Sequence, residues 1–413
     1  MKHSVSRIPD RFLVLALLLL GIGNLVVPAL YRELIPFDYL TASLALTAVI
    51  VTFRLRQIFQ RVNAWWPMAI LLVACLPGFF AAPLSPYGAT KAQAFAIAFA
   101  IVLACCSISD PRWLLPHLVR ALLAVSVVFT AAASALGTAD VAGRLVFLGL
   151  NPIGIGRVAG LVIVLALALV LIDLRGPLRI VLLLGVACVG LVGVIATGSR
   201  GPLVAVALAI GVLLVMLASV RRISGRTTAL LMLTGLGVGA VVTVSSSAGL
   251  ARLSSGSDSG RSELYAESLQ LAFDTPLGIG WGQLGQYIVD FRATDPDSLY
   301  SHNVFLEMYV EGGVVALVAF TFLAVIAARR AWLAARRDVR AAPVLVLYAY
   351  ALTSAQFSSD VVGNRLLWLA IGLALLSTWV HAEDSADGDE GPGPVRESCA
   401  LRQHGLVRRG SFL

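Results

Sequence analysis

The sequence has little charge. Charged residues make up only 13% of the 413 residues, against about 25% in ordinary soluble domains. Hydrophobic residues make up 59%, and the mean hydropathy is +0.89. Its apolar stretches run for about 20 residues, the length at which an α-helix crosses a bilayer with its backbone groups paired. They also lack the alternation of a transmembrane β-barrel. These features exclude a soluble domain and predict an all-α, polytopic transmembrane helical bundle.

Cysteine is scarce as well. Of five cysteines, four lie in apolar stretches, where a thiol behaves as a small hydrophobe. These four are Cys75, Cys105, Cys106 and Cys188, and the fifth, Cys399, lies near the C-terminal end. Their spacing matches neither a metal site nor a disulfide framework. We expect no metal and no cofactor.

Twelve stretches have the length and apolarity of transmembrane helices. They are 12–30, 37–53, 65–83, 91–109, 114–138, 157–174, 178–197, 202–220, 228–249, 303–327, 342–358 and 365–381. The first lacks a clear small-residue cleavage site of a signal peptide, so we expect it to be a retained helix. Residues 1–381 therefore form the predicted transmembrane domain. The polar tail, 382–413, has the composition of a disordered segment.

Basic residues gather in alternate loops, which predicts the orientation of the chain. The basic set of loops holds Lys2, Arg7, Arg11, Arg54, Arg56, Arg61, Arg112, Arg175, Arg179, Arg221, Arg222 and Arg226, and its last loop, 328–340, holds five more arginines. The opposite set holds only Arg32, Lys91, Arg144, Arg157, Arg200 and Arg365. We expect both termini in the cytoplasm and the longest loop, 250–302, outside. The net charge of +8 follows mostly from this bias and does not indicate nucleic-acid binding.

The loop 250–302 is a polar island between apolar stretches. Its Ser/Gly/Asp-rich start, 254–260, favours turns, and Asp258 or Ser259 can cap a following helix. From Arg261 to Phe273, apolar residues recur at helical spacing, which predicts a short amphipathic helix along the membrane surface. Pro276 and the glycines that follow it end this helix.

Isolated ionisable residues at membrane depth usually mark a working site, because charge is costly there. Arg200 stands alone between two apolar stretches and precedes Pro202, so we expect it at a helix N-terminus, where an anion is favoured. The alternative for Arg200, and likewise for Arg261, is a purely structural role, in which the arginine snorkels to the membrane surface or pairs with a carboxylate. His302 is the only histidine expected outside, and its ordinary pKa suits a general base. Its alternative role is to cap the next helix.

Three polar residues follow along that next helix. Asn303, Glu307 and Glu311 are spaced four apart and therefore lie on one stripe. Glu311 would lie about 13 Å beyond His302, so we expect it to form a structural ion pair. Glu307 is near enough to orient local groups, and a catalytic-base role for it is less favoured.

Other polar and aromatic residues flank the outer loops. Asp360 and Arg365 lie on either side of the last outer turn. They either close the same cavity or pair with each other, and we expect pairing. Tyr300 and Trp281 have side chains that can stack on a sugar, but aromatic residues are common at a membrane interface.

Three motifs, taken in order, resemble the bacterial O-antigen ligase/polymerase superfamily. They are GSRG at 198–201, PLGIG at 276–280 with Gly282, and HNVFLE at 302–307 with EGG at 311–313. The resemblance extends over about 190–325, and the helix count and the position of the large outer loop agree with it. It implies a GT-C-like bundle that is an inverting, metal-independent glycosyltransferase.

The resemblance also implies substrates and roles. A glycan on an undecaprenyl-diphosphate carrier would be transferred to an acceptor hydroxyl at the outer side of the inner membrane. Arg200 and Arg261 would bind the diphosphate and His302 would activate the acceptor, with Ser199, Asn303 and Glu307 in support. The loop of roughly fifty residues favours a ligase over a polymerase. The sequence leaves the acceptor open: a glycan such as a growing polysaccharide, lipid A core, or another cell-envelope acceptor such as a cell-wall polymer or a protein.

Two other classes of function compete with this interpretation. A transporter suits twelve spans, but folds of two six-helix halves usually have a long central link, and here the sixth and seventh spans are joined by a few residues near Gly176. The candidate residues also gather at one face rather than at the midplane. A flippase or scaffold for lipid-linked glycans would need the same arginines. Loss of transfer on replacing His302, with carrier binding retained, would separate the enzyme from these.

Overall fold

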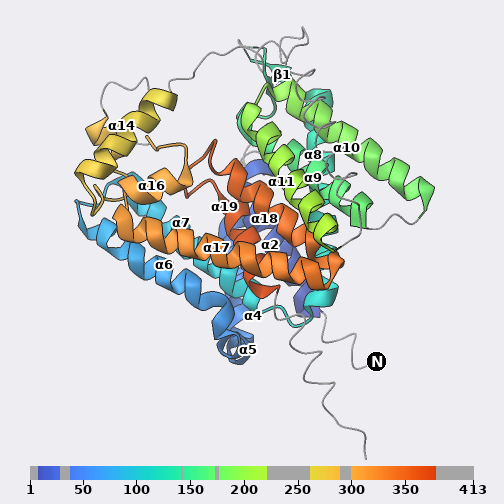
Figure 1. Ribbon diagram of the computed structural model, residues 1–413, viewed down its shortest axis with the longest axis horizontal. Coiled ribbons are helices and arrows are strands. Elements are labelled where there is room, and N and C mark those ends of the chain that lie inside the picture. Colours follow the sequence, from blue (N-terminus) through green and yellow to red (C-terminus); the bar gives the residue numbers. More distant parts are fainter. Residues whose placement is uncertain are drawn as a thin grey trace, which may run out of the picture.

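The structure, a computed structural model, describes residues 8–27, 38–140, 143–172, 176–220, 261–288 and 299–377. This part is almost entirely helical (Figure 1). The helices are α2 (Ile8–Val26), α4 (Tyr39–Phe53), α5 (Leu55–Gln60), α6 (Val62–Phe80), α7 (Pro86–Cys106), α8 (Pro111–Leu136), α9 (Pro152–Ile172), α10 (Pro177–Thr197), α11 (Arg200–Ser219), α14 (Arg261–Asp274), α15 (Leu284–Tyr287), α16 (Val304–Val310), α17 (Gly313–Arg337), the 3-10 helix η2 (Val339–Ala341), α18 (Ala342–Ser354) and α19 (Arg365–Leu376). Two short antiparallel strands, β1 (Thr138–Ala139) and β2 (Leu145–Val146), pair Thr138 with Val146.

Among the described residues, eight helices are long and apolar enough to cross a membrane. They are α2, α6, α7, α8, α9, α10, α11 and α17, and shorter apolar helices cover Tyr39–Phe53, Val339–Ser354 and Arg365–Leu376. Together these coincide with eleven of the twelve predicted spans. The remaining span, 228–249, lies outside the described residues, as do the tail 382–413 and the predicted cap at 258–259. The multi-pass, all-α architecture is confirmed, whereas the count of twelve and the orientation stay predictions.

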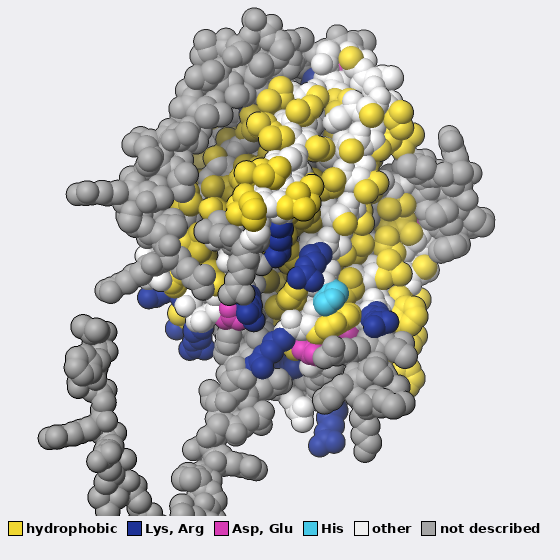
Figure 2. Space-filling model, turned by 90° about the vertical axis from the view of Figure 1, so that its right-hand side faces the viewer, with side chains coloured by type: hydrophobic (Ala, Val, Ile, Leu, Met, Phe, Trp, Pro, Cys, Tyr) yellow, Lys and Arg dark blue, Asp and Glu magenta, His cyan; other side chains and the backbone are white. Residues whose placement is uncertain are grey.

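The core of the bundle is built around α9. In its candidate membrane span 78% of the residues are buried, and α8, α10, α11 and α18 pack against it. By contrast, α10 lies at the edge of the bundle (Figure 1). Its side chains Leu178, Val181 and Val192 are exposed. Figure 2 views this side and shows a broad apolar surface with basic side chains gathered toward its lower end. Such a surface fits a lipid-facing helix layer with polar ends.

The predicted span 303–327 is two helices rather than one. α16 ends at Val310, and α17 begins at Gly313, whose φ is +78°. The loop 276–282 crosses the chain at this break, where the Ile279 N–H donates to the Val310 carbonyl and the Val314 N–H donates to the Pro276 carbonyl. The loop thus satisfies backbone groups that the break frees, as burial in a membrane protein requires.

Helix α7 begins five residues earlier than predicted. Ser85 accepts a hydrogen bond from the Gly88 N–H, and Pro86 takes the first helical position, so the two residues form a regular N-terminus. As a consequence Lys91 is not an outer-loop charge but a fully buried residue inside the helix. In the same way α17 continues to Arg337, so much of the predicted basic loop 328–340 is helix.

The predicted amphipathic helix exists as α14. The buried face consists of Leu264, Ser268 and Ala272, whereas Leu269 and Phe273 are exposed. Tyr265, Leu269, Ala272 and Phe273 are the apolar residues at helical spacing, and of these only Ala272 belongs to the buried face. The exposed apolar side chains suit the predicted contact with a membrane surface, which stays a prediction.

Candidate active site

The segment 355–364, between α18 and α19, brings distant parts of the chain together. A Cβ atom added at Gly201 would lie 2.8 Å from Cβ of Phe357, so the start of α11 packs directly on this segment. The Arg261 guanidinium donates to the Phe357 carbonyl through Nη1 at 2.8 Å. The starts of α11 and α14, which carry Arg200 and Arg261, therefore meet at the same residue.

Arg200 is the first residue of α11, as predicted, and its side chain is exposed. The preceding Gly198 ends α10 in the left-handed conformation, with φ of 60°, which turns the chain sharply into the new helix. Ser199 occupies the N-cap position, but its hydroxyl makes no capping hydrogen bond and instead contacts the Thr197 carbonyl at 3.4 Å. The terminal N–H groups of α11 and the Arg200 side chain thus form a suitable place for an anion.

His302 is fixed through its backbone. The Tyr265 hydroxyl donates to the carbonyls of His302 at 3.4 Å and Gln356 at 3.3 Å, and the Val304 N–H donates to Ala355 at 3.2 Å. The φ of His302 is +56°, an uncommon conformation outside glycine that often accompanies function. The His302 ring centroid lies 4.2 Å from that of Tyr300.

The imidazole of His302 is available as a base. Burial lowers its pKa to about 4, and the positive charge of Arg261 adds to this, whereas Asp360 opposes it. The ring is therefore neutral at neutral pH, and among the described residues Nδ1 is a buried nitrogen without a hydrogen-bond partner. The capping role considered for His302 belongs to Asn303, whose side chain accepts from the N–H groups of Phe305 and Leu306. Asn303 thus has a structural function that accounts for it.

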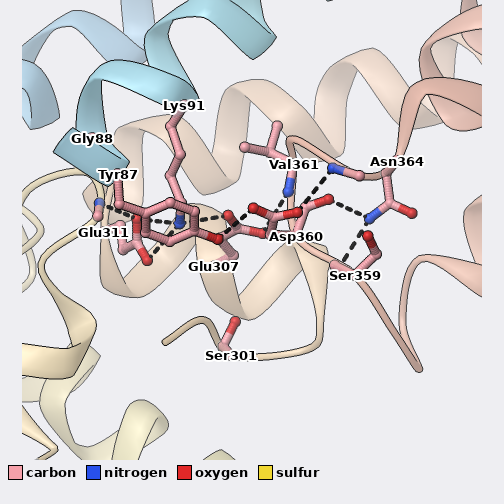
Figure 3. A network of polar contacts seen from close by, with 12 residues as sticks. Tyr87, Gly88, Lys91, Ser301, Glu307, Glu311, Ser359, Asp360, Val361 and Asn364 are labelled. Carbon is pink, nitrogen blue, oxygen red and sulfur yellow. Dashed lines mark hydrogen bonds and ion pairs between the residues drawn. The ribbon is translucent and has the colours of Figure 1, made fainter. Parts of the chain in front are cut away.

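A buried ionic network supports this site (Figure 3). The Lys91 ammonium lies 2.7 Å from a Glu307 oxygen and 2.6 Å from a Glu311 oxygen, and all three side chains are fully buried. Glu311 also accepts from the Gly282 N–H at 2.7 Å, and Glu307 from the Val361 N–H at 3.0 Å. The predicted structural ion pair of Glu311 is confirmed, with Lys91 as its partner. Glu307 holds the segment 355–364 to α16.

Asp360 does not make the predicted pair with Arg365 among the described residues. Instead, its carboxylate accepts hydrogen bonds from the Tyr87 hydroxyl and the Gly363 N–H (Figure 3). Asn364 continues the network, because its amide nitrogen donates to the Asp360 carbonyl at 2.7 Å while its amide oxygen accepts from Arg157 at 2.6 Å. Sequence reasoning missed Tyr87, Lys91 and Arg157 as site neighbours. The one available signal was that Lys91 is one of only two lysines.

The glycine-rich loop 276–282 joins the network from the other side. Gly278, Gly280 and Gly282 all have positive φ, and a Cβ at Gly282 would lie 2.5 Å from the Gly88 nitrogen. Trp281 is buried, and its indole N–H donates to the Cys75 carbonyl at 2.9 Å. Trp281 thus lies inside the protein, because the loop folds back into the bundle, and the interfacial position that suited this residue in the sequence is not the one it takes.

The arrangement combines two arginines, a helix N-terminus and a neutral histidine around one short segment. It can hold an anion and accept a proton close to it. In the described part of the chain, no group of three or more His, Cys, Asp or Glu side chains is placed to hold a metal ion.

One known family resembles part of the chain. Residues 180–321 match the family model described as O-Antigen ligase. The matched region contains Arg200, Arg261, His302, Glu307 and Glu311, whereas Lys91 and Asp360 lie outside it. No curated protein matches the chain. The match confirms the resemblance seen in the motifs: residues 180–321 are similar to the O-antigen ligase family, a family of glycosyltransferase-type enzymes, and the apolar helices around them are those of a multi-pass membrane protein.

Proposed function

We propose that the protein transfers a glycan from an undecaprenyl-diphosphate carrier to an acceptor hydroxyl, as an O-antigen ligase does. The observation that carries this proposal is the convergence of Arg200, Arg261 and His302 on the segment 355–364. The reaction would take place at the outer side of the inner membrane, where the basic-loop pattern puts this segment.

The arginines suit the donor. When the bond between the anomeric carbon and the diphosphate breaks, negative charge grows on the leaving oxygen, and preorganised cations stabilise it. Arg200 adds a guanidinium fork to the N–H groups that begin α11, and Arg261 adds a second cation. In this role the two arginines supply the charge that a metal ion supplies in other phosphate-binding sites.

His302 suits the acceptor. The acceptor oxygen would attack the anomeric carbon on the face opposite the diphosphate, which inverts the configuration at that carbon. Its proton would pass to the neutral imidazole of His302, whose lowered pKa keeps the ring unprotonated before each turnover. Glu307 would act indirectly, by holding the segment 355–364 against α16.

The test is the surface-glycan banding pattern of a strain that lacks this protein, with lipid-linked intermediates measured in parallel. We expect long polymer to accumulate on the lipid carrier while the acceptor stays bare, and re-expression of the parent protein to restore transfer. Single repeats that still reach the acceptor would instead indicate a polymerase. Carrier-linked glycan that accumulates only on the cytoplasmic side would indicate a flippase. Unchanged patterns in both fractions would contradict the proposal.

A further inference from the structure

Arg157 is a buried cation that the proposed mechanism does not use. It lies on α9, and only 3% of the residue is exposed. Nη2 donates to the Asn364 amide oxygen at 2.6 Å, but Nε has no acceptor among the described residues. No carboxylate in the described ranges forms an ion pair with it. Lys91, which is equally buried, has two carboxylates within 2.7 Å.

A buried guanidinium without a carboxylate partner needs an explanation. Removing an ion from water is costly, and buried charges are normally paired and fully hydrogen-bonded. A single neutral amide oxygen meets this requirement only in part. An anion that arrives with the substrate would complete it, and ionisable groups inside membrane helices commonly mark such substrate sites.

The location of Arg157 indicates which anionic group of the substrate would contact it. The neighbouring Gly156 packs on the turn before α11, since a Cβ there would lie 2.9 Å from Oγ1 of Thr197 and 3.4 Å from Cβ of Ser199. Arg157 itself contacts the segment 355–364 through Asn364. This part of α9 therefore packs both on the turn that carries Arg200 and on the segment on which Arg261 and His302 converge.

Asn364 holds the guanidinium in this place. Its amide nitrogen faces the carbonyls of Ser359 and Asp360, and its oxygen points the opposite way (Figure 3). Both ends of the Asn364 amide are thus hydrogen-bonded, which fixes its orientation. One side of the Arg157 fork is fixed by this contact, and the Nε–H remains as a donor for an incoming oxygen.

We propose that Arg157 is the third cation of the diphosphate site and donates from Nε to a phosphate oxygen of the lipid-linked donor. This inference rests on the proposed function, because it takes the donor to be a polyprenyl diphosphate. In this proposal Arg157 contacts the second phosphate. Replacing Arg157 should therefore weaken the binding of a diphosphate more than the binding of a monophosphate. A role as mere counter-charge to Asp360 would require only a positive charge, which lysine also supplies.

The test measures binding of a short-chain polyprenyl diphosphate and of the matching monophosphate to the purified full-length protein in detergent. We expect Arg157→Gln to weaken diphosphate binding by about tenfold or more, the loss of one charge-assisted hydrogen bond, and to change monophosphate binding much less. Arg157→Lys, which keeps the charge and should keep the fold, should recover only part of the diphosphate affinity. Arg144→Gln is the matched control, because Arg144 is paired with Asp140 beside the hairpin of β1 and β2.

The outcomes separate this inference from the proposed function. If Arg157→Lys binds the diphosphate and the monophosphate with the same affinity ratio as the parent protein, the proposed role of Arg157 is wrong. If Arg157→Gln does not fold, the result for Arg157→Lys alone decides the question. If Arg200→Gln weakens diphosphate binding in the same assay while both Arg157 variants bind like the parent, only the further inference fails. If the parent protein does not bind the diphosphate at all, both fail.

Discussion

At the scale of single residues, two neighbours, His302 and Asn303, have different roles. From the sequence either one can cap the helix that follows, and only the structure shows which one does. Asn303 accepts the first N–H groups of α16, which is the work of an N-cap. His302, one residue earlier, takes a left-handed backbone conformation and keeps its ring away from that cap. A histidine that capped the helix would have no free acceptor nitrogen. The division therefore favours a chemical role for the imidazole.

Replacing His302 tests that role. We expect His302→Gln to lower the rate of glycan transfer by about 10²- to 10⁴-fold, the usual contribution of a general base, with donor binding unchanged. The measurement is single-turnover transfer by purified protein with a lipid-linked donor and its acceptor. His117→Gln is the control, since His117 lies exposed near the start of α8. Transfer at the parental rate by a folded His302→Gln protein would rule out the base.

The low pKa of His302 predicts the pH dependence of transfer. A base must be unprotonated, so the rate should fall only as the pH drops toward about 4, rather than near the ordinary 6.5. The Arg261 charge disfavours the imidazolium, so Arg261→Gln should move this acid limb upward in addition to slowing transfer. The same shift should make the folded protein less stable as the pH falls from 6.5 to 4, because there the unfolded chain binds the proton more strongly.

The pH–rate profile between pH 3.5 and 8 checks this prediction. Stability is followed over the same range by thermal unfolding, so that loss of fold is not mistaken for loss of the base. An acid limb near 6.5 in the parent protein, or a profile that Arg261→Gln leaves in place, would contradict it.

Sequence alone predicts a functional role for ionisable residues that stand isolated along the chain, and it overlooks residues whose role depends on a distant partner. Arg200 and His302 stand out because each is an isolated ionisable group at the edge of an apolar stretch. Lys91 pairs with Glu311, which is 220 residues away, and no local spacing reveals that contact. Arg157 likewise meets Asn364 only in the folded chain. Tertiary pairing decides which buried charges belong to a site.

At the scale of elements, the glycine-rich loop 276–282 and the break between α16 and α17 depend on each other. The loop supplies backbone partners at the break, and the break supplies Glu311, whose carboxylate accepts from the Gly282 N–H. The sequence marks the break with Glu311-Gly312-Gly313, yet the surrounding residues are apolar enough to predict one continuous span. The break is stable only where another segment pairs its backbone groups. Hydropathy along the chain does not show which segment does so, and therefore does not predict the break.

Gly282→Ala tests the loop. With φ of +74° and the Gly88 nitrogen 2.5 Å from the new Cβ, alanine both strains the backbone and displaces α7. The positive φ alone costs about 1–2 kcal/mol, so we expect a lower unfolding temperature and reduced transfer. Gly185→Ala is the matched control, because Gly185 lies in α10 with open space around its Cβ position. Equal unfolding temperatures of the two variants in detergent would show that the loop tolerates a side chain.

The ionic network between α7 and α16 makes a second prediction at this scale. Lys91→Met leaves two buried carboxylates without their cation, and breaking a buried pair in this way typically costs about 3–5 kcal/mol. Adding Glu307→Gln and Glu311→Gln removes the unpaired charge, so the triple variant should unfold at a higher temperature than Lys91→Met alone. Circular dichroism during heating in the same detergent compares the two. A triple variant no more stable than the single one would show that shape, rather than charge balance, holds these helices.

At the scale of the whole molecule, contacts separate into two ends that agree with the alternation of basic loops. At one end, Arg54 lies 2.5 Å from Asp10, and Gln57 donates to the Ile108 carbonyl at 2.7 Å, which joins the segments predicted to be cytoplasmic. At the other end, α11, α14 and α16 meet the segment 355–364. Apolar stretch length was sufficient to predict eleven of the described helices, because a spanning helix must be long and apolar whatever it packs against. Their lateral arrangement followed from side-chain packing that sequence periodicity does not encode.

The orientation of these two ends is testable by labelling. In a variant without its five cysteines, Glu267→Cys places a thiol on the exposed face of α14, and Gln60→Cys places one on the exposed end of α5. The basic residues around α5 should keep it in the cytoplasm. A membrane-impermeant maleimide added to intact spheroplasts should therefore label Glu267→Cys, and should label Gln60→Cys only after the membrane is opened. The reverse pattern would put Arg200, Arg261 and His302 on the cytoplasmic side, where an acceptor outside the cell membrane cannot reach them. Labelling of both variants before the membrane is opened would contradict the separation of the two ends.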